Sequence, residues 1–360
     1  MAHDTGGDAA SGRGDRTRSG RGGVTLHDVA AAAGVSKSTV SRILDERLPR
    51  SHSSTAERVR RAAAELGYTR DVSAASLRRG NTMTIGVVVP RLTDTVMAML
   101  FEELAHACEA AGRFAVVATT DDEPDADRLA VDALLQRRVD GLVLTTARSN
   151  DDFPQQLAAR GVPFVLALRT DGHSPASVGD DELGGYLATR HLLDLGHRRI
   201  GLIAGPQYAS SARGRVAGYR RAMSEARIDV PPDWVVESTF GIEAGADAAA
   251  RLLQLDPRPT AVFAVNDNTA IGALSAIRNA GLFVPDDISL VGYNDIPIVS
   301  RLPTPLTTVR VPFDQVARAA LDLLLAESPG SPGQVRVAAP TLIPRRSTAA
   351  PADLRPHRAH

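Results

Sequence analysis

Several residue types are scarce in this chain, and each shortage excludes a class of protein. The one cysteine, Cys108, allows no disulfide within the chain and no cysteine-rich zinc site. Its alanine- and leucine-containing surroundings indicate a buried helix residue rather than a reactive thiol. No run of about eighteen apolar residues occurs, and the polar, glycine- and arginine-rich N-terminus lacks an apolar secretory core. We therefore expect a globular protein of the cytoplasm with no membrane partner.

Lysine is nearly absent, because 40 of the 41 basic residues are arginine and the remaining one is Lys37. The formal net charge of −1 hides an asymmetry: residues 1–81 carry 14 basic and 9 acidic side chains, a net of +5, which leaves −6 for the rest. Positive charge gathered in one part of a chain favours a polyanionic partner. The alternative for Lys37 alone is a chance lysine on a solvated helix face.

Residues 24–45 carry the most informative local pattern. Thr25, with Asp28 three positions later, has the spacing of a helix cap and predicts a helix that starts near Leu26. Apolar residues at helical spacing follow, and Gly34 stands where a left-handed residue ends such a helix.

A second helix is predicted after the cap residue Ser36, and its first turns present a polar, partly basic face. Two short helices around a tight turn, with such a face on the second, are typical of a helix-turn-helix that enters a DNA groove. The outward residues of this face are Lys37, Ser38, Ser41 and Arg42.

A third helix is predicted from about Ser53 to Leu66, with Leu66 on its apolar side and Gly67 and Tyr68 closing it. The three helices form a DNA-binding headpiece over residues 24–70. Residues 1–23 have the composition of a disordered solubilising tail; a loose contact with phosphates is the alternative.

Beyond residue 83, short continuous apolar runs alternate with amphipathic stretches. Each run has the length of a fully buried parallel strand. The predicted strands are 85–89, 114–118, 141–144, 163–166, 200–204, 234–236, 261–265 and 288–292, and the predicted helices are 97–111, 124–138, 152–160, 183–195, 211–227, 241–255 and 267–280. Repeated units of this kind imply two doubly wound α/β lobes, whose ligands bind beyond the strand carboxyl ends, in the cleft between lobes.

Residues 71–81 connect the headpiece to the lobes. Their alanine and leucine content allows a short helix, but a helix this brief is marginal alone, so we expect it to form only on DNA. A plain linker is the alternative. The predicted organisation is therefore a tail (1–23), a headpiece (24–70), a hinge (71–81), a two-lobed effector-binding and dimerisation domain (82–348) and a flexible tail (349–360).

This order of parts resembles the lactose-repressor (LacI/GalR) family of bacterial transcription regulators, from about Val24 to Thr348. The resemblance implies an all-α helix-turn-helix headpiece followed by a periplasmic-binding-protein-like domain with two parallel sheets. The motifs that carry it, besides residues 24–42, are Leu66-Gly67-Tyr68, Leu195-Gly196-His197-Arg198-Arg199-Ile200, Arg215-x-x-Gly218-Tyr219, Ala264-Val265-Asn266-Asp267 and Val284-Pro285-Asp286-Asp287-Ile288-Ser289-Leu290-Val291-Gly292-Tyr293.

The resemblance also implies which residues bind DNA. Lys37, Ser38 and Arg42 would contact base edges, and the headpiece would be positioned on phosphates by Thr25, Leu26, Ser36, Thr39 and Ser41. In the hinge, Ala74 would contact DNA and Leu77 would insert into the minor groove and kink the duplex. Because two such wedges act at one centre, the family binds pseudo-palindromic operators as dimers.

In the cleft, the resemblance implies a small-molecule effector held by Arg215, Asn266, Asp267 and Asn294, with Phe240 stacked on its apolar face. A guanidinium fork beside amides and a carboxylate suits vicinal hydroxyls, so we expect a sugar or polyol. Thr145 is a weaker candidate at a strand end. The alternative for Asp267 is that it only caps the helix that follows.

Departures from the family pattern bear on specificity. Leu168 replaces a carboxylate that is common in the family's cleft, and Asn294 stands where aspartate is frequent, which puts a typical hexose in doubt. Asp45 replaces the usual asparagine of the headpiece. The C-terminus carries no leucine heptads for a tetramerisation helix, which favours a homodimer.

Other function classes find little in the sequence. It has no P-loop, no Gly-x-Ser-x-Gly and no His-Glu-x-x-His, so we expect no enzyme, no cofactor and no metal site. A two-lobed small-molecule binding protein without a regulatory role shares the predicted fold but has no need of residues 24–81. The expected protein is a DNA-binding regulator, more specifically a repressor, controlled by its cleft ligand.

Overall fold

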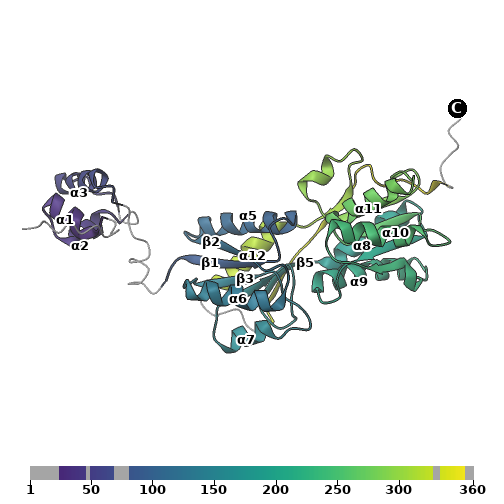
Figure 1. The fold of residues 1–360 in the computed structure, drawn as a ribbon, viewed down its shortest axis with the longest axis horizontal. Helices are drawn as coiled ribbons and strands as arrows, with labels where there is room; N and C mark the ends of the chain where they lie inside the picture. The colour runs from purple at the N-terminus through teal and green to yellow at the C-terminus, as the bar shows by residue number, and fades with distance from the viewer. Residues whose placement is uncertain (1–23, 46–48, 69–80, 327–332, 353–360) are drawn as a thin grey trace, which may run out of the picture. The chain divides into compact units, whose positions relative to one another are not determined.

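The computed structural model describes residues 24–45, 49–68, 81–326 and 333–352, and the chain divides into two compact units between Arg78 and Arg79 (Figure 1). The predicted N-terminal tail and the hinge positions Ala74 and Leu77 lie outside the described residues.

The first unit contains three helices, α1 (Leu26–Ala33), α2 (Lys37–Ile43) and α3 (Ser54–Glu65). The predicted caps are confirmed. Thr25 and Asp28 form a capping box on α1, and Gly34 ends that helix in the left-handed conformation at φ 63°. The Ser36 hydroxyl accepts a hydrogen bond from the Thr39 amide at 3.2 Å and so caps α2.

One valine from each helix forms the centre of this small core: Val29, Val40 and Val59 are fully buried. α3 also fastens α1, because Arg58 Nε donates to the carbonyl oxygen of Ala33 at 2.9 Å. The prediction that Leu66 belongs to the apolar side of the third helix was wrong. α3 ends at Glu65, and the Leu66 side chain, beyond it, is 39% exposed.

The first lobe of the second unit is built on a six-stranded sheet in the order β11-β5-β4-β3-β1-β2, in which every pairing is parallel. Its strands are β1 (Thr84–Val89), β2 (Phe114–Thr119), β3 (Gly141–Leu144), β4 (Phe164–Ala167), β5 (Ala176–Gly179) and β11 (Val335–Ala338). Its helices are α5 (Thr95–Ala110), α6 (Pro124–Gln136), α7 (Phe153–Ala159) and α12 (Phe313–Leu325).

Alternating residues of the strands fill two separate cores, one on each face of this sheet. Val87 lies on the face covered by α5 and α12, whereas Val88 lies on the face covered by α6 and α7. Because both faces are buried, the central strands β1, β3 and β4 are almost continuously apolar, as the sequence indicated. Cys108 is fully buried in α5, as predicted.

The second lobe repeats this architecture with the sheet order β12-β10-β9-β8-β6-β7, in which only the β10–β12 pairing is antiparallel. Its strands are β6 (Ile200–Ala204), β7 (Val235–Glu237), β8 (Ala261–Ala264), β9 (Ser289–Asn294), β10 (Thr307–Arg310) and β12 (Thr341–Ile343). Its α-helices are α8 (Asp181–Asp194), α9 (Ser210–Glu225), α10 (Ile242–Leu253) and α11 (Asp267–Asn279), with 3₁₀ turns η1 (Pro232–Trp234) and η2 (Pro297–Ser300). None of the helices in the described part of the chain is long and apolar enough to cross a membrane.

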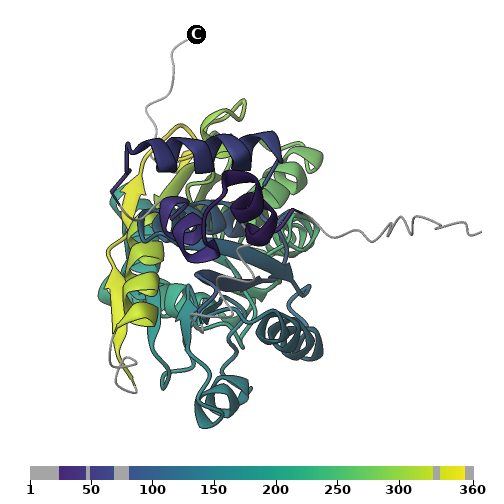
Figure 2. The same cartoon turned by 90° about the vertical axis from the view of Figure 1, so that its left-hand side faces the viewer.

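The chain passes between the lobes three times, after β5, after β10 and after β11. Figure 2 shows α12 beside strand β11, both in yellow, after the chain has returned to the first lobe. The strands and helices predicted for the two lobes are confirmed with end points within two residues. The sequence interpretation did not include β5, β10, β11, β12 or α12, the elements next to these crossings.

Glycines allow two helices of the second lobe to pack backbone against backbone. A Cβ on Gly218 of α9 would overlap the carbonyl oxygen of Glu182 and would lie 2.5 Å from the amide nitrogen of Tyr186, both on α8. Gly185 of α8 makes the reciprocal approach to the backbone of Arg215. The α8–α9 contact therefore sets the position of Arg215.

We predict that Gly218→Ala lowers the free energy of unfolding of the second unit by about 1–3 kcal/mol, because backbone atoms cannot move aside as a side chain can. Ala217→Ser is the matched control, since it also adds one heavy atom to α9 but at an exposed position. Denaturant titration of both variants measures the difference. Equal midpoints for the two variants would contradict the assigned packing.

Candidate functional site

The outer side of α2 presents Lys37, Ser38 and Arg42 to solvent, and all three side chains are exposed. Lys37 and Ser38 place a cation and a hydroxyl at the N-terminal turn of the helix, where backbone amides also point outward. This surface therefore offers hydrogen-bond donors and positive charge. Thr39 and Ser41 are partly buried beside it.

The remaining predicted headpiece contacts also serve the fold. The Ser36 hydroxyl lies 2.9 Å from the Ser38 hydroxyl and 2.8 Å from that of Thr39. The Thr25 hydroxyl donates to Asp28 Oδ2 at 2.7 Å, and Leu26 packs against the headpiece core. These residues stabilise the N-terminal ends of α1 and of α2, the helix with the exposed face.

A cavity of about 540 Å³ lies between the two lobes of the second unit, a volume typical of small-molecule sites. Most of its wall consists of residues that end or directly follow parallel strands in both sheets, so the strand carboxyl ends converge on it. Among the residues that line it are Pro90 and Asp122 after β1 and β2, Arg148 and Arg169 after β3 and β4, Tyr208 and Phe240 after β6 and β7, and Asn266, Asn294 and Val311 after or at the ends of β8, β9 and β10.

Arg215 of α9 lines the cavity as predicted from the sequence, in a fixed orientation. Its Nε donates to Asp181 Oδ1 at 2.8 Å, and Nη1 donates to the carbonyl oxygen of Val265 at 2.7 Å. The guanidinium lies 3.8 Å from the centre of the Tyr293 ring. Two of its five N–H groups are therefore used by the protein.

Asn266, Phe240 and Asn294 also line the cavity. Asn266 is the N-cap of α11: its Oδ1 accepts from the Thr269 amide at 2.8 Å, and its Nδ2 donates to the carbonyl oxygen of Phe240 at 3.0 Å. Asn294 is 4% exposed and adopts a left-handed φ of 106°.

Thr145 and Asp267 are not among the residues that line the cavity. Thr145 is fully buried and donates to the carbonyl oxygen of Val88 at 3.1 Å. Asp267 is likewise fully buried, and its neighbour Asn266, not Asp267, provides the helix cap. Burial raises the pKa of Asp267 to about 7.

Sequence reasoning missed a cluster that joins the lobes at the cavity wall. Arg169 donates to both carboxylate oxygens of Asp122, at 2.9 and 3.2 Å, and the Tyr208 hydroxyl donates to Asp122 Oδ2 at 2.8 Å. The Arg148 guanidinium stacks 3.9 Å from the centre of the Tyr208 ring and donates to the Asp122 carbonyl oxygen. The signal that could have found these residues is their place after β2, β3, β4 and β6.

A backbone hydrogen bond from the Ser149 amide to the carbonyl oxygen of Tyr208 at 3.0 Å also crosses from lobe to lobe, and so do three hydrogen bonds that involve side chains. Asn268 Nδ2 donates to Asp94 Oδ1 at 3.2 Å, the Thr170 amide donates to Ser210 Oγ at 2.8 Å, and Arg213 Nη1 donates to Ser149 Oγ at 2.8 Å. Burial raises the pKa of the Asp94 carboxyl. The lobes are thus held together by direct polar contacts.

Two family patterns match the chain. The pattern described as bacterial regulatory proteins, lacI family, matches residues 25–71, and the periplasmic binding protein-like domain matches residues 189–348. The ribose operon repressor of Haemophilus influenzae is 35% identical over 327 residues, which cover 90% of this chain and 98% of that protein.

Solved structures agree in fold. The lac repressor dimer bound to operator and the anti-inducer ONPF matches with a TM-score of 0.81 and 31% identity, over 91% of this chain and 99% of that one. A LacI-family regulator from Enterococcus faecium with bound ribose matches with a TM-score of 0.64 and 28% identity, over 74% of this chain and 99% of that one. With a helix-turn-helix headpiece, two parallel-sheet lobes and these relatives, the chain belongs to the lacI family of bacterial regulatory proteins.

Proposed function

We propose that this protein is a transcriptional repressor that binds a pseudo-palindromic operator as a homodimer in the cytoplasm, with DNA affinity controlled by a small ligand in the interlobe cavity. One observation supports the proposal. The same chain has an exposed face of hydrogen-bond donors on the capped helix α2 and a polar cavity that both lobes line. The lac repressor dimer, whose structure bound to operator is known, has a similar fold.

In this proposal the exposed residues of α2 read the operator. Lys37 and Arg42 donate to guanine acceptors in the major groove, and Ser38 bonds a neighbouring base edge. Contacts with phosphates come from Thr25, Leu26, Ser36 and Thr39, whose backbone or hydroxyl groups lie in the caps and first turns of the two helices, and from Ser41 in the second turn of α2. Ala74 and Leu77, outside the described residues, complete the interface as hinge contacts.

The ligand we propose is a sugar or related polyol. The remaining N–H groups of Arg215 and the amides of Asn266 and Asn294 supply donors and acceptors for hydroxyl groups, and the Phe240 ring supplies an apolar face. The Enterococcus faecium relative contains ribose, which is a molecule of this class. Arg169 and Asp122 add a charged wall with acceptors that the sequence interpretation did not include.

Ligand binding changes the separation of the lobes, because the same residues bond one lobe to the other and line the cavity. The hinge connects each headpiece to its lobes. In the dimer, a change in lobe separation therefore alters how the two headpieces bind one operator. Coupling of this kind is typically about 1–3 kcal/mol, which corresponds to about 5–150-fold in operator affinity.

We predict that Lys37→Ala and Arg42→Ala each weaken operator binding by about 5–150-fold, because each change removes contacts with a base worth about 1–3 kcal/mol. The matched control is Arg61→Ala, which removes an exposed arginine from α3. Fluorescence anisotropy with operator and with shuffled DNA measures the loss. If operator and shuffled DNA lost affinity equally, these side chains would be phosphate contacts and the assignment would fail.

We predict that Arg215→Lys lowers ligand affinity at least about tenfold, because lysine keeps the charge beside Asp181 but loses the planar fork. Operator affinity without ligand stays within a few-fold of wild type. A thermal-shift screen with ribose, other sugars, polyols and nucleosides identifies the ligand, and calorimetry compares the variant with Arg220→Lys, an exposed position on the same helix. Wild-type affinity in Arg215→Lys would exclude this cavity as the ligand site.

A further inference from the structure

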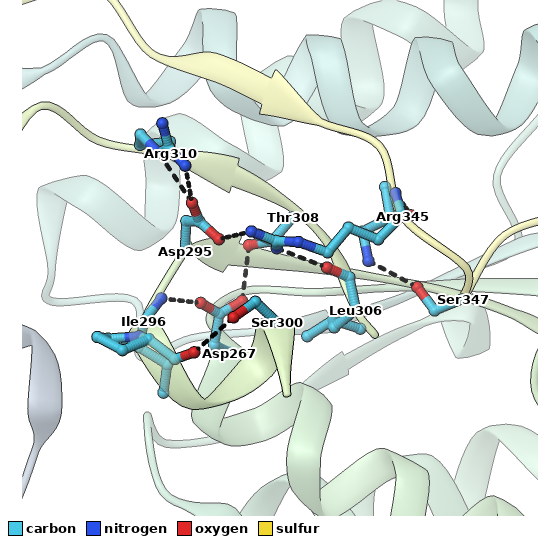
Figure 3. Close-up of polar contacts among 11 residues, drawn as sticks. Asp267, Asp295, Ile296, Ser300, Leu306, Thr308, Arg310, Arg345 and Ser347 are labelled. Carbon is cyan, nitrogen blue, oxygen red and sulfur yellow. Dashed lines mark hydrogen bonds and ion pairs between the residues drawn. The ribbon is translucent and has the colours of Figure 1, made fainter. Parts of the chain in front are cut away.

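Asp267 is the first residue of α11 and directly follows Asn266 of the cavity wall, yet its own side chain is fully buried away from the cavity. Figure 3 shows its carboxylate directed toward β10 and the segment after β9. A buried carboxylate requires hydrogen-bond donors, and the identity of those donors indicates what Asp267 does.

The Asp267 carboxylate connects α11 to two other elements. Oδ2 accepts from the backbone amide of Ile296 at 2.8 Å, and Oδ1 accepts from the Thr308 hydroxyl of β10 at 2.7 Å. The approach to β9 is also close, because a Cβ on Gly292 would overlap Asp267 Oδ1. The position at residue 292 therefore requires glycine, and the carboxylate lies against the strand that ends at Asn294.

The segment fixed by Asp267 has an unfavourable backbone. Asn294 and Asp295 are consecutive non-glycine residues with φ values of 106° and 59°, and such conformations persist only when the surroundings enforce them. On the opposite side, the Asp295 carboxylate accepts from Arg345 at 2.6 Å and from Arg310 at 2.7 Å (Figure 3). The turn at Asn294 and Asp295 is thus held on one side by Asp267 and on the other by Arg310 and Arg345.

We propose that Asp267 is a positioning residue for the ligand site: through the Ile296 amide it holds the left-handed turn that presents Asn294 to the cavity. It sets ligand affinity without touching the ligand. This inference rests on the proposed function of the cavity. The Thr308 hydrogen bond, by contrast, fastens Asp267 to β10 and stabilises the lobe.

A neutral side chain of the same shape preserves this role. The amide oxygen of asparagine accepts the Ile296 N–H, and its Nδ2 donates to the Thr308 hydroxyl, which also has acceptor capacity. Burial raises the pKa of the Asp267 carboxyl, so its surroundings favour a neutral side chain. Asp267→Asn is therefore the conservative variant, and Asp267→Ala removes both hydrogen bonds.

The test uses the full-length protein in four forms: wild type, Asp267→Ala, Asp267→Asn and Thr308→Val. Thr308→Val is the control for a purely structural role, because it removes the bond to β10 but keeps the one to Ile296. Hydrogen exchange of the Ile296 amide reports the turn without any ligand. Calorimetry with ribose, or with the polyol found in the thermal-shift screen, reports affinity.

We expect Asp267→Ala to speed exchange of the Ile296 amide and to weaken ligand affinity, each at least about tenfold, and Asp267→Asn to restore both to within about threefold of wild type. Thr308→Val lowers the unfolding temperature but leaves affinity within about threefold. Unchanged Ile296 exchange in Asp267→Ala, or equal losses of affinity in Thr308→Val and Asp267→Ala, would overturn the inference. If wild type bound none of the compounds, the proposed function of the cavity would fail, and Ile296 exchange would still decide whether Asp267 holds the turn.

Discussion

The parallel arrangement of the strands is the constraint on which the rest of this structure depends. Parallel strands end at one edge of a sheet, and the two sheets of this chain turn those edges toward a common cavity. The chain passes between the lobes three times, so a change in the separation of the lobes involves the whole domain. A molecule bound at the strand ends contacts both lobes at once, so its binding energy acts directly on their separation.

The polar side chains at these strand ends are held in place by buried contacts that do not face the cavity. Arg215 is oriented by Asp181 and a backbone carbonyl, and its helix is set by glycine contacts with α8. Asn294 is presented by a turn that the Asp267 carboxylate fastens. Preorganisation of this kind leaves less conformational entropy to be lost when a ligand binds.

The success and the limits of the sequence interpretation have physical causes. Strands such as β1 are buried on both faces and are therefore continuously apolar, which makes them visible in the sequence. β11 has three exposed residues out of four, and β12 is three residues long, so neither gives a periodic signal. α12 does carry a helical pattern in the sequence, because its buried residues Val316, Ala317, Ala320 and Leu321 recur at helical spacing. The Asp122–Arg169–Tyr208 cluster joins residues far apart in sequence, and only the folded lobes bring them together.

Coupling between the cavity and the operator is measured by the affinity for the ligand in the presence and absence of operator DNA. Thermodynamic linkage requires that operator DNA change the ligand's dissociation constant by the same factor by which the ligand changes that of the operator. We expect two equal factors within the range of about 5–150-fold. A ligand that binds the cavity with the same affinity whether or not operator is present would contradict this coupling.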